Sequence, residues 1–167
     1  MELLITVVED MPMVQPTIPK FARRKLLLAF LHHAGGRVQK NAFHFLLFLF
    51  HRDERLEQYS FSPSFSGCIS FLADDDVDLL AKRGWILETE HELVLDSSVS
   101  PNLFLTPILN RKLAQFFASH DGKAVESLAA QIKASYPFYF LENSEKRETK
   151  DDEKDTLFTI GYEGISL

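Results

Sequence analysis

Apolar positions recur with the period of an α-helix along three stretches of the chain, residues 20–34, 38–51 and 68–83. The second stretch is apolar on nearly every side, which is typical of a helix buried at the centre of a core. Gly35 and Gly84 directly follow the first and third stretches and end them. The sequence therefore predicts three helices, the second of which is central.

Strand-like alternation is short and lies between and after these helices. Residues 59–63 are rich in aromatic and hydroxyl side chains and predict a short strand. Residues 85–88 and 93–95, separated by a polar turn, predict a β-hairpin. The order helix, helix, strand, helix, hairpin is that of a winged helix.

Two further helices are expected, over 107–120 with Thr106 as N-cap and over 122–135. The predicted fold class is mainly α with a small β-hairpin (α+β), a winged helix-turn-helix with two extra C-terminal helices. This domain covers residues 20–141. Residues 1–19, which contain three spaced prolines, predict an N-terminal arm that packs on it.

The composition changes abruptly at residue 142. From 142 to 155 acidic and basic residues alternate without any aliphatic side chain, which predicts a solvated linker. Residues 156–167 have the pattern of a buried strand and a glycine-flanked turn, and one strand is not stable without a sheet. We therefore expect a second α/β domain, truncated after its first strand and turn.

The overall charge disfavours a generic nucleic-acid-binding protein. The net charge is −6, from 24 acidic and 18 basic residues, whereas affinity for nucleic acid comes largely from neutralised phosphates. The single cysteine excludes an internal disulfide and is compatible with a reducing compartment. No apolar stretch reaches the ~18 residues of a membrane span, and no signal peptide is evident. We expect a cytoplasmic protein without membrane contact.

The segment from Tyr59 to Ile86 resembles the YwgA-like winged helices, which are similar to the Panacea antitoxin domains. The shared features are an aromatic-rich strand, a glycine-containing turn, and a helix ended by a glycine and an apolar strand. Arg37-Val-Gln-Lys40 is similar to the basic helix start of these families, and Tyr136-Pro-Phe-Tyr139 to an element that follows the domain. The resemblance covers about residues 20–140, implies a winged-helix fold and is compatible with binding to a protein.

The segment from Thr159 to Leu167 resembles the opening of the prokaryotic family called domain of unknown function 488. In that family the strand T-I-G-Y-E-G precedes a helix and further strands that carry most of the polar motif residues. None of those elements is present in this sequence, so no activity is carried over. The turn residues themselves are Gly161, Tyr162, Glu163 and Gly164.

The third expected helix disfavours DNA as the partner. In winged helices this helix commonly enters the major groove. Its spacing places Asp74, Asp75 and Asp78 on the exposed side, where they would repel phosphates.

A basic cluster lies elsewhere, and it is either a phosphate-contacting patch or, as we prefer, the solvated face of an amphipathic helix. Its members are Lys20, Arg23, Arg24, Lys25, Arg37 and Lys40.

The aromatic side chains Tyr59, Phe61 and Phe65 lie close together in the sequence. They form either a partner surface, together with the aspartates of the third helix, or a lid over the core.

We expect neither a metal nor a cofactor, because no histidines have the spacing of a helical metal pair and no phosphate-binding loop is present. Cys68, at the expected start of the third helix, is a lone cysteine of the kind that is usually packed.

Three functional hypotheses follow. The first is a non-catalytic winged-helix recognition module that binds a protein or self-associates. The second is a DNA-binding transcriptional regulator that uses the basic cluster. The third is a regulatory N-terminal part of an enzyme whose active site lies beyond residue 167.

Overall fold

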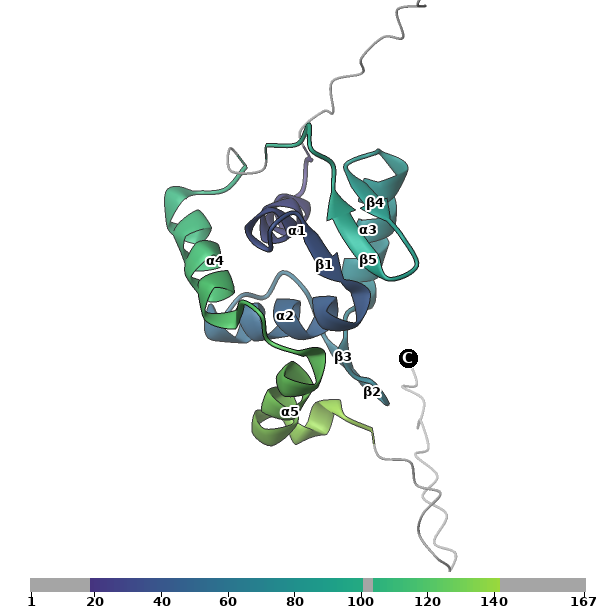
Figure 1. Cartoon of the computed structure of the whole chain (residues 1–167), viewed down its shortest axis with the longest axis vertical. Coiled ribbons are helices and arrows are strands. Elements are labelled where there is room, and N and C mark those ends of the chain that lie inside the picture. The colour runs from purple at the N-terminus through teal and green to yellow at the C-terminus, as the bar shows by residue number, and fades with distance from the viewer. Residues whose placement is uncertain (1–18, 101–103, 142–167) are drawn as a thin grey trace, which may run out of the picture.

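The computed structural model describes residues 19–100 and 104–141 (Figure 1). The expected linker 142–155, the strand and turn 156–167, and all of the N-terminal arm except Pro19 lie outside these residues. Within the described part the fold class is α+β, with five α-helices, a three-stranded antiparallel sheet and a separate two-stranded hairpin.

The elements follow one another in a simple order. They are α1 (Ala22–His33), β1 (Arg37–Gln39), α2 (Lys40–Asp53), β2 (Ser62–Ser64), β3 (Gly67–Ile69), α3 (Phe71–Lys82), β4 (Ile86–Glu88), β5 (Glu92–Leu95), α4 (Pro107–His120), α5 (Val125–Ser135) and the short 3-10 helix η2 (Pro137–Tyr139).

Helix α2 is the centre of the core, which confirms the prediction from its nearly uniform apolar surface. It contacts β1, β3 and α5, and Figure 1 shows it running across the middle of the molecule. Phe30 of α1 packs edge-on against Phe43, with ring centroids 6.2 Å apart, and lies 6.4 Å from the ring of Phe50. Aromatic pairs of this kind add specific geometry to a large buried area.

The predicted hairpin is confirmed as β4 and β5, and a third strand joins it. β1 pairs with β5 in antiparallel register, Val38 opposite Leu93, so the strand order is β1-β5-β4. The expectation that α2 begins at residue 38 was therefore wrong, and the helix begins at Lys40. A three-residue strand with only Val38 buried is too short to produce a periodic signal.

The region before α3 also differs from the prediction. Cys68 is not in the first turn of α3 but in β3, opposite Pro63 of β2. Gly67 allows this hairpin, because it adopts a φ of +117° that other residues rarely take. Helix α3 then begins at Phe71, and the side chain of Ser70 caps it by accepting a hydrogen bond from the N–H of Ala73.

The two C-terminal helices cover α1 and α2. Helix α4 has the expected bounds, and the Thr106 side chain caps it, whereas α5 begins at Val125 rather than at 122. Phe117 of α4 lies 4.8 Å from the ring of Phe30, and Phe116 lies 5.3 Å from the ring of Phe50. Within residues 19–100 and 104–141, none of the helices combines the length and the hydropathy that a transmembrane span requires.

Candidate functional site

The exposed side of α3 carries the acidic residues that the helical spacing placed there. Asp74, Asp75 and Asp78 are exposed, while Val77 and Leu80 of the same helix are buried. We call these three aspartates the α3 acidic face. Phe71, at the first turn of α3, leaves 64% of its surface exposed and gives this side of the helix an apolar end.

A fourth aspartate of α3 points the other way and ties the helix to α1. Asp76 is only 1% exposed, yet its carboxylate accepts hydrogen bonds from Nε of Arg23 and Nε of Arg24, each 2.6 Å away. The hydroxyl of Tyr59 also donates to it, at 3.1 Å. A buried carboxylate is tolerated only when its charge is compensated in this way.

The titration of this cluster follows from its geometry. Burial alone would raise the pKa of Asp76, but the hydrogen bonds from Arg23, Arg24 and Tyr59 outweigh burial and hold that pKa below its usual value. Burial, reinforced by the charge of Asp76, raises the pKa of Tyr59. The carboxylate therefore stays ionised and the phenol stays protonated at neutral pH, as the hydrogen bonds require.

The α3 acidic face is also connected to α2 through His44. The backbone N–H of Ser70 donates to Nδ1 of His44 at 3.2 Å, so Nδ1 carries no proton. Nε2 lies 3.1 Å from Oδ1 of Asp74 and donates to it. Burial lowers the pKa of His44 even though Asp74 opposes this, which is consistent with a neutral ring. Both ring nitrogens take part in these contacts, so His44 joins α2 to the start of α3 and is not a free base.

The predicted basic cluster is largely engaged in ion pairs within the chain. Arg23 and Arg24 hold Asp76. Nζ of Lys40 lies 2.6 Å from a carboxylate oxygen of Glu88 in β4, and Arg37 lies 3.9 Å from Glu92 in β5. Lys20 is exposed and Lys25 is half-buried. The structure thus does not bring these six residues together as one open cationic patch.

The aromatic stretch divides between core and surface. Tyr59, which we expected on a partner surface or in a core lid, is buried at 4% exposure because its hydroxyl reaches Asp76. Phe61 is half-buried and packs against Phe48, with centroids 5.2 Å apart. Phe65, in the turn between β2 and β3, remains 70% exposed. Only Phe65 of the three is available to a partner.

The described residues contain no nucleophile or metal centre that the contacts support. Cys68 is 1% exposed, and burial raises the pKa of its thiol to about 12, so it is protonated at neutral pH. Within residues 19–100 and 104–141, no three His, Cys, Asp or Glu side chains come together to hold a metal ion.

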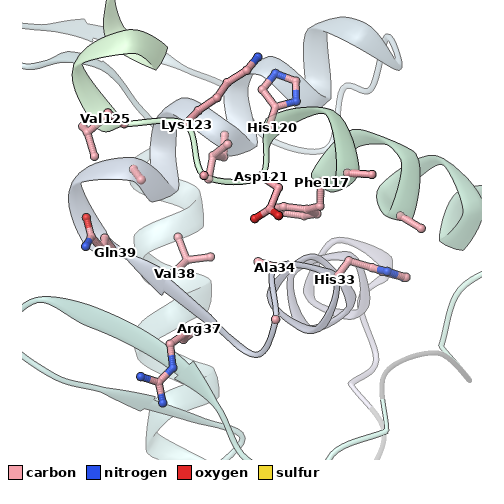
Figure 2. Close-up of a pocket in the computed structure, with 17 residues that line it drawn as sticks. His33, Ala34, Arg37, Val38, Gln39, Phe117, His120, Asp121, Lys123 and Val125 are labelled. Carbon is pink, nitrogen blue, oxygen red and sulfur yellow. The ribbon is translucent and has the colours of Figure 1, made fainter.

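A cavity of about 720 Å³ lies between the end of α1, β1 and the loop that joins α4 to α5 (Figure 2). Figure 2 shows the carboxylate of Asp121 facing this hollow beside Phe117, whereas Arg37 is directed toward the hairpin. Its wall mixes charges of both signs with small apolar side chains, including Ala34. The lining therefore favours no single class of ligand.

Sequence reasoning missed the role of Asp76 as a buried partner of two arginines. The signal was present, because Asp76 lies between Ala73 and Leu80 on the buried side of α3. The predicted turn residues Gly161, Tyr162, Glu163 and Gly164 lie outside the described residues. No family model, curated protein or solved structure matches this chain.

Proposed function

We propose that residues 20–141 form a winged-helix recognition module that binds a basic surface of another protein through the α3 acidic face. The observation that carries this proposal is the exposed side of α3 itself, where Asp74, Asp75 and Asp78 adjoin the exposed Phe71. Exposed aromatic side chains are frequent anchors in protein interfaces, and surrounding charges select the partner and steer its approach.

The order of elements supports the winged-helix interpretation. Helices α1, α2 and α3 are followed by the β4–β5 hairpin, and β1 adds to that hairpin in the order β1-β5-β4. In winged helices the helix that precedes the hairpin is the recognition helix. On this interpretation α3 corresponds to the recognition helix, and the acidic face lies where such a helix contacts its partner.

Charge argues against duplex DNA as the partner. A DNA-binding surface gains affinity by neutralising phosphates, whereas Asp75 and Asp78 would repel them. Lys40 and Arg37, from the expected basic cluster, already lie beside Glu88 and Glu92 of the hairpin. Duplex DNA would therefore have to break existing ion pairs to gain new ones.

Charge also argues against self-association through this surface. A two-fold symmetric dimer would bring the same patch of each copy together, so the aspartates of α3 would face each other. The chain as a whole has a net charge of −6, which adds to the repulsion. A different protein with a basic surface is the partner that this side of α3 favours.

Site-specific photo-cross-linking tests the proposal. A photoreactive phenylalanine analogue at Phe71 reports on the α3 acidic face, and the same analogue at Ile108 is the matched control, since both side chains are well exposed at 64% and 67%. We expect a protein adduct from position 71 only, which disappears when Asp75→Lys and Asp78→Lys are added. Equal adducts from both positions would contradict the proposal.

Duplex DNA binding at ~50 mM salt is the second readout, because electrostatic binding is strongest at low salt. We expect none. Binding that is lost in Lys20→Glu/Arg37→Glu would instead favour the transcriptional-regulator hypothesis. Arg23 and Arg24 are unsuitable for this test, because replacing them would disturb the buried Asp76.

A further inference from the structure

The three-stranded sheet has an open edge at β1. This strand is the outer one in the order β1-β5-β4, and β5 is its only strand partner among the described residues. The N–H of Lys40 donates to the carbonyl oxygen of His91 at the end of the β1–β5 ladder. Because bonded and non-bonded pairs alternate along an antiparallel ladder, the N–H and C=O groups of Arg37 and Gln39 point away from β5.

Three of these outward groups have no backbone partner among the described residues. They are the N–H and the C=O of Arg37 and the N–H of Gln39. The C=O of Gln39 is already used, because Gln39 is the N-cap residue of α2 and its carbonyl accepts the first bond of that helix. A row of unpaired donors and acceptors on a strand edge is a template for one more strand.

The cavity of about 720 Å³ lies along this edge. All three residues of β1 line it, and Figure 2 shows Val38 on the β1 side of the hollow and Phe117 on the α4 side. Ala42 and Leu46 of α2 add to its apolar wall. A strand paired with β1 directs every second side chain to the same face of the sheet as Val38. Unpaired backbone groups and space for side chains therefore coincide at this edge.

The N-terminal segment of the chain has the composition of such a strand. Residues 3–8 read Leu-Leu-Ile-Thr-Val-Val and are rich in the β-branched side chains that favour strands. In an extended conformation Leu3, Ile5 and Val7 share one face, and Thr6 lies on the other. The first face is entirely apolar and matches the apolar wall of the cavity.

The segment is long enough to reach β1. Pro19, the first described residue, is buried, so the arm meets the domain there. Helix α1 has 12 residues and is about 18 Å long, and β1 follows it after residues 34–36. The connection from Val8 to Pro19 spans up to about 34 Å in the extended conformation that its prolines favour. The arm can therefore run back along α1 and place residues 3–8 beside β1.

Charge distinguishes β1 from β4, the other outer strand of the sheet. Residues 1–19 contain no basic side chain, and their acidic side chains are Glu2, Glu9 and Asp10. Glu88 of β4 belongs to a cavity lined by three carboxylates and one lysine, which would repel such an arm. The cavity at β1 is lined by Arg37 and Lys123 and by one carboxylate, that of Asp121. The acidic arm is thus complementary to the edge at β1.

We propose that residues 3–8 bind to the open edge of β1 as a fourth strand of the sheet, with Leu3, Ile5 and Val7 directed into the cavity. Because the segment belongs to the same chain, its effective concentration at this edge is on the order of millimolar. The bound segment covers an edge that would otherwise pair with strands of other proteins, and such a strand would have to displace it.

Amide hydrogen exchange of the full chain, measured by NMR, tests the proposal at single residues. We expect the amides of Arg37 and Gln39 to be protected, although they point away from β5. Ile5→Pro/Thr6→Pro removes one donor from each edge of the segment, so these two amides should exchange at least tenfold faster in this variant. The amide of Val38, which faces β5, is the internal control and should keep its protection.

A matched variant controls for the proline substitutions themselves. Gln15→Pro lies in the same arm but outside residues 3–8, and it should leave all three amides unchanged. Fast exchange of Arg37 and Gln39 in the wild-type chain would overturn the proposal and leave the edge open to another polypeptide. Protection that is equal in the wild-type chain and in Ile5→Pro/Thr6→Pro would also overturn it. Protection that decreases on dilution would assign the strand to a second copy of the chain and contradict pairing within one chain.

A substitution in the domain tests the cavity independently of the arm. Ala118 of α4 is exposed and lines the cavity, so Ala118→Phe obstructs the space for Ile5. Gln115→Phe, at an exposed position of the same helix outside the lining, is the control. We expect the amides of Arg37 and Gln39 to exchange severalfold faster in Ala118→Phe and at the wild-type rate in Gln115→Phe. Equal rates in the two variants would refute the use of this cavity.

Discussion

Among single residues, Asp76 depends most on its neighbours. Its carboxylate is buried between α3 and α1, and donors from Arg23, Arg24 and Tyr59 compensate its charge. The two guanidinium groups are still partly in water, with side-chain exposures of 28% and 14%. The cluster is therefore weaker than a fully buried ion pair, but it links α1 to α3.

We expect Asp76→Asn to lower the free energy of unfolding by about 2–3 kcal/mol, somewhat less than the loss of a fully buried pair. The amide keeps the size of the side chain but leaves two arginines without a counter-charge. Urea unfolding followed by circular dichroism measures the change. Asp75→Asn, one residue earlier and exposed, is the control and should stay within about 0.5 kcal/mol. Equal effects of the two substitutions would show that the cluster contributes nothing.

The buried histidines predict a dependence of stability on pH. Burial lowers the pKa of His44 below the ordinary 6.5, although the charge of Asp74 opposes this shift. Burial also lowers the pKa of His51, and the charge of Arg52 adds to that shift. The unfolded chain therefore binds protons at a pH where the folded chain does not. This contribution to stability is complete above pH 6.5 and is lost as the pH falls through the lower folded-state values.

The urea midpoint should thus decrease when the pH is lowered from 7 to 5. The decrease should be smaller in His44→Asn, whose amide oxygen can still accept from Ser70. His91→Asn is the control, because the His91 side chain is 81% exposed. A midpoint that does not change over this range would contradict the argument.

Among the elements, the β2–β3 hairpin is fixed by its close approach to α2. A Cβ atom on Gly67 would lie 2.6 Å from Cε1 of Phe45, and the φ of +117° is itself unfavourable for other residues. No side chain larger than hydrogen fits without a shift of α2 or the hairpin.

We expect Gly67→Ala to destabilise the protein by about 2–4 kcal/mol, from overpacking together with backbone strain. Gly84→Ala is the matched control. Gly84 also has a positive φ, of +72°, but nothing lies within 4 Å of a Cβ built on it. That control should cost only the strain of about 1–2 kcal/mol. Thermal unfolding of both variants separates the clash from the strain, and equal losses would argue against the close packing.

In the whole molecule, α4 and α5 complete the core of the three preceding helices. Leu113 and Phe116 of α4 and Leu128 and Ile132 of α5 are buried in the same hydrophobic cluster as α1 and α2. Each side chain of this kind contributes about 1.5–3 kcal/mol when buried, so together they approach the whole stability of a typical domain.

A chain that ends at residue 100 should therefore fail to fold cooperatively, since Phe30 and Phe50 lose the rings that cover them. Near-ultraviolet circular dichroism and binding of a hydrophobic dye, compared with the full chain, measure this. Cooperative unfolding at an unchanged midpoint would show instead that α4 and α5 are an appendage.

The sequence alone determined the features that depend on local periodicity. Neighbours a few residues apart decide these features, so they could be predicted. They are the burial of α2, the β4–β5 hairpin, the capping of α4 by Thr106 and the outward side of Asp74, Asp75 and Asp78.

Only the tertiary structure decided which residues meet across the chain. Asp76 pairs with Arg23, 53 residues away, and this contact buries Tyr59 and removes two arginines from the expected basic patch. β1 exists because β5 pairs with it. Hydrophobic periodicity indicates which side of an element is buried, but the partner of a buried charge or of a short strand is selected by packing of the whole chain.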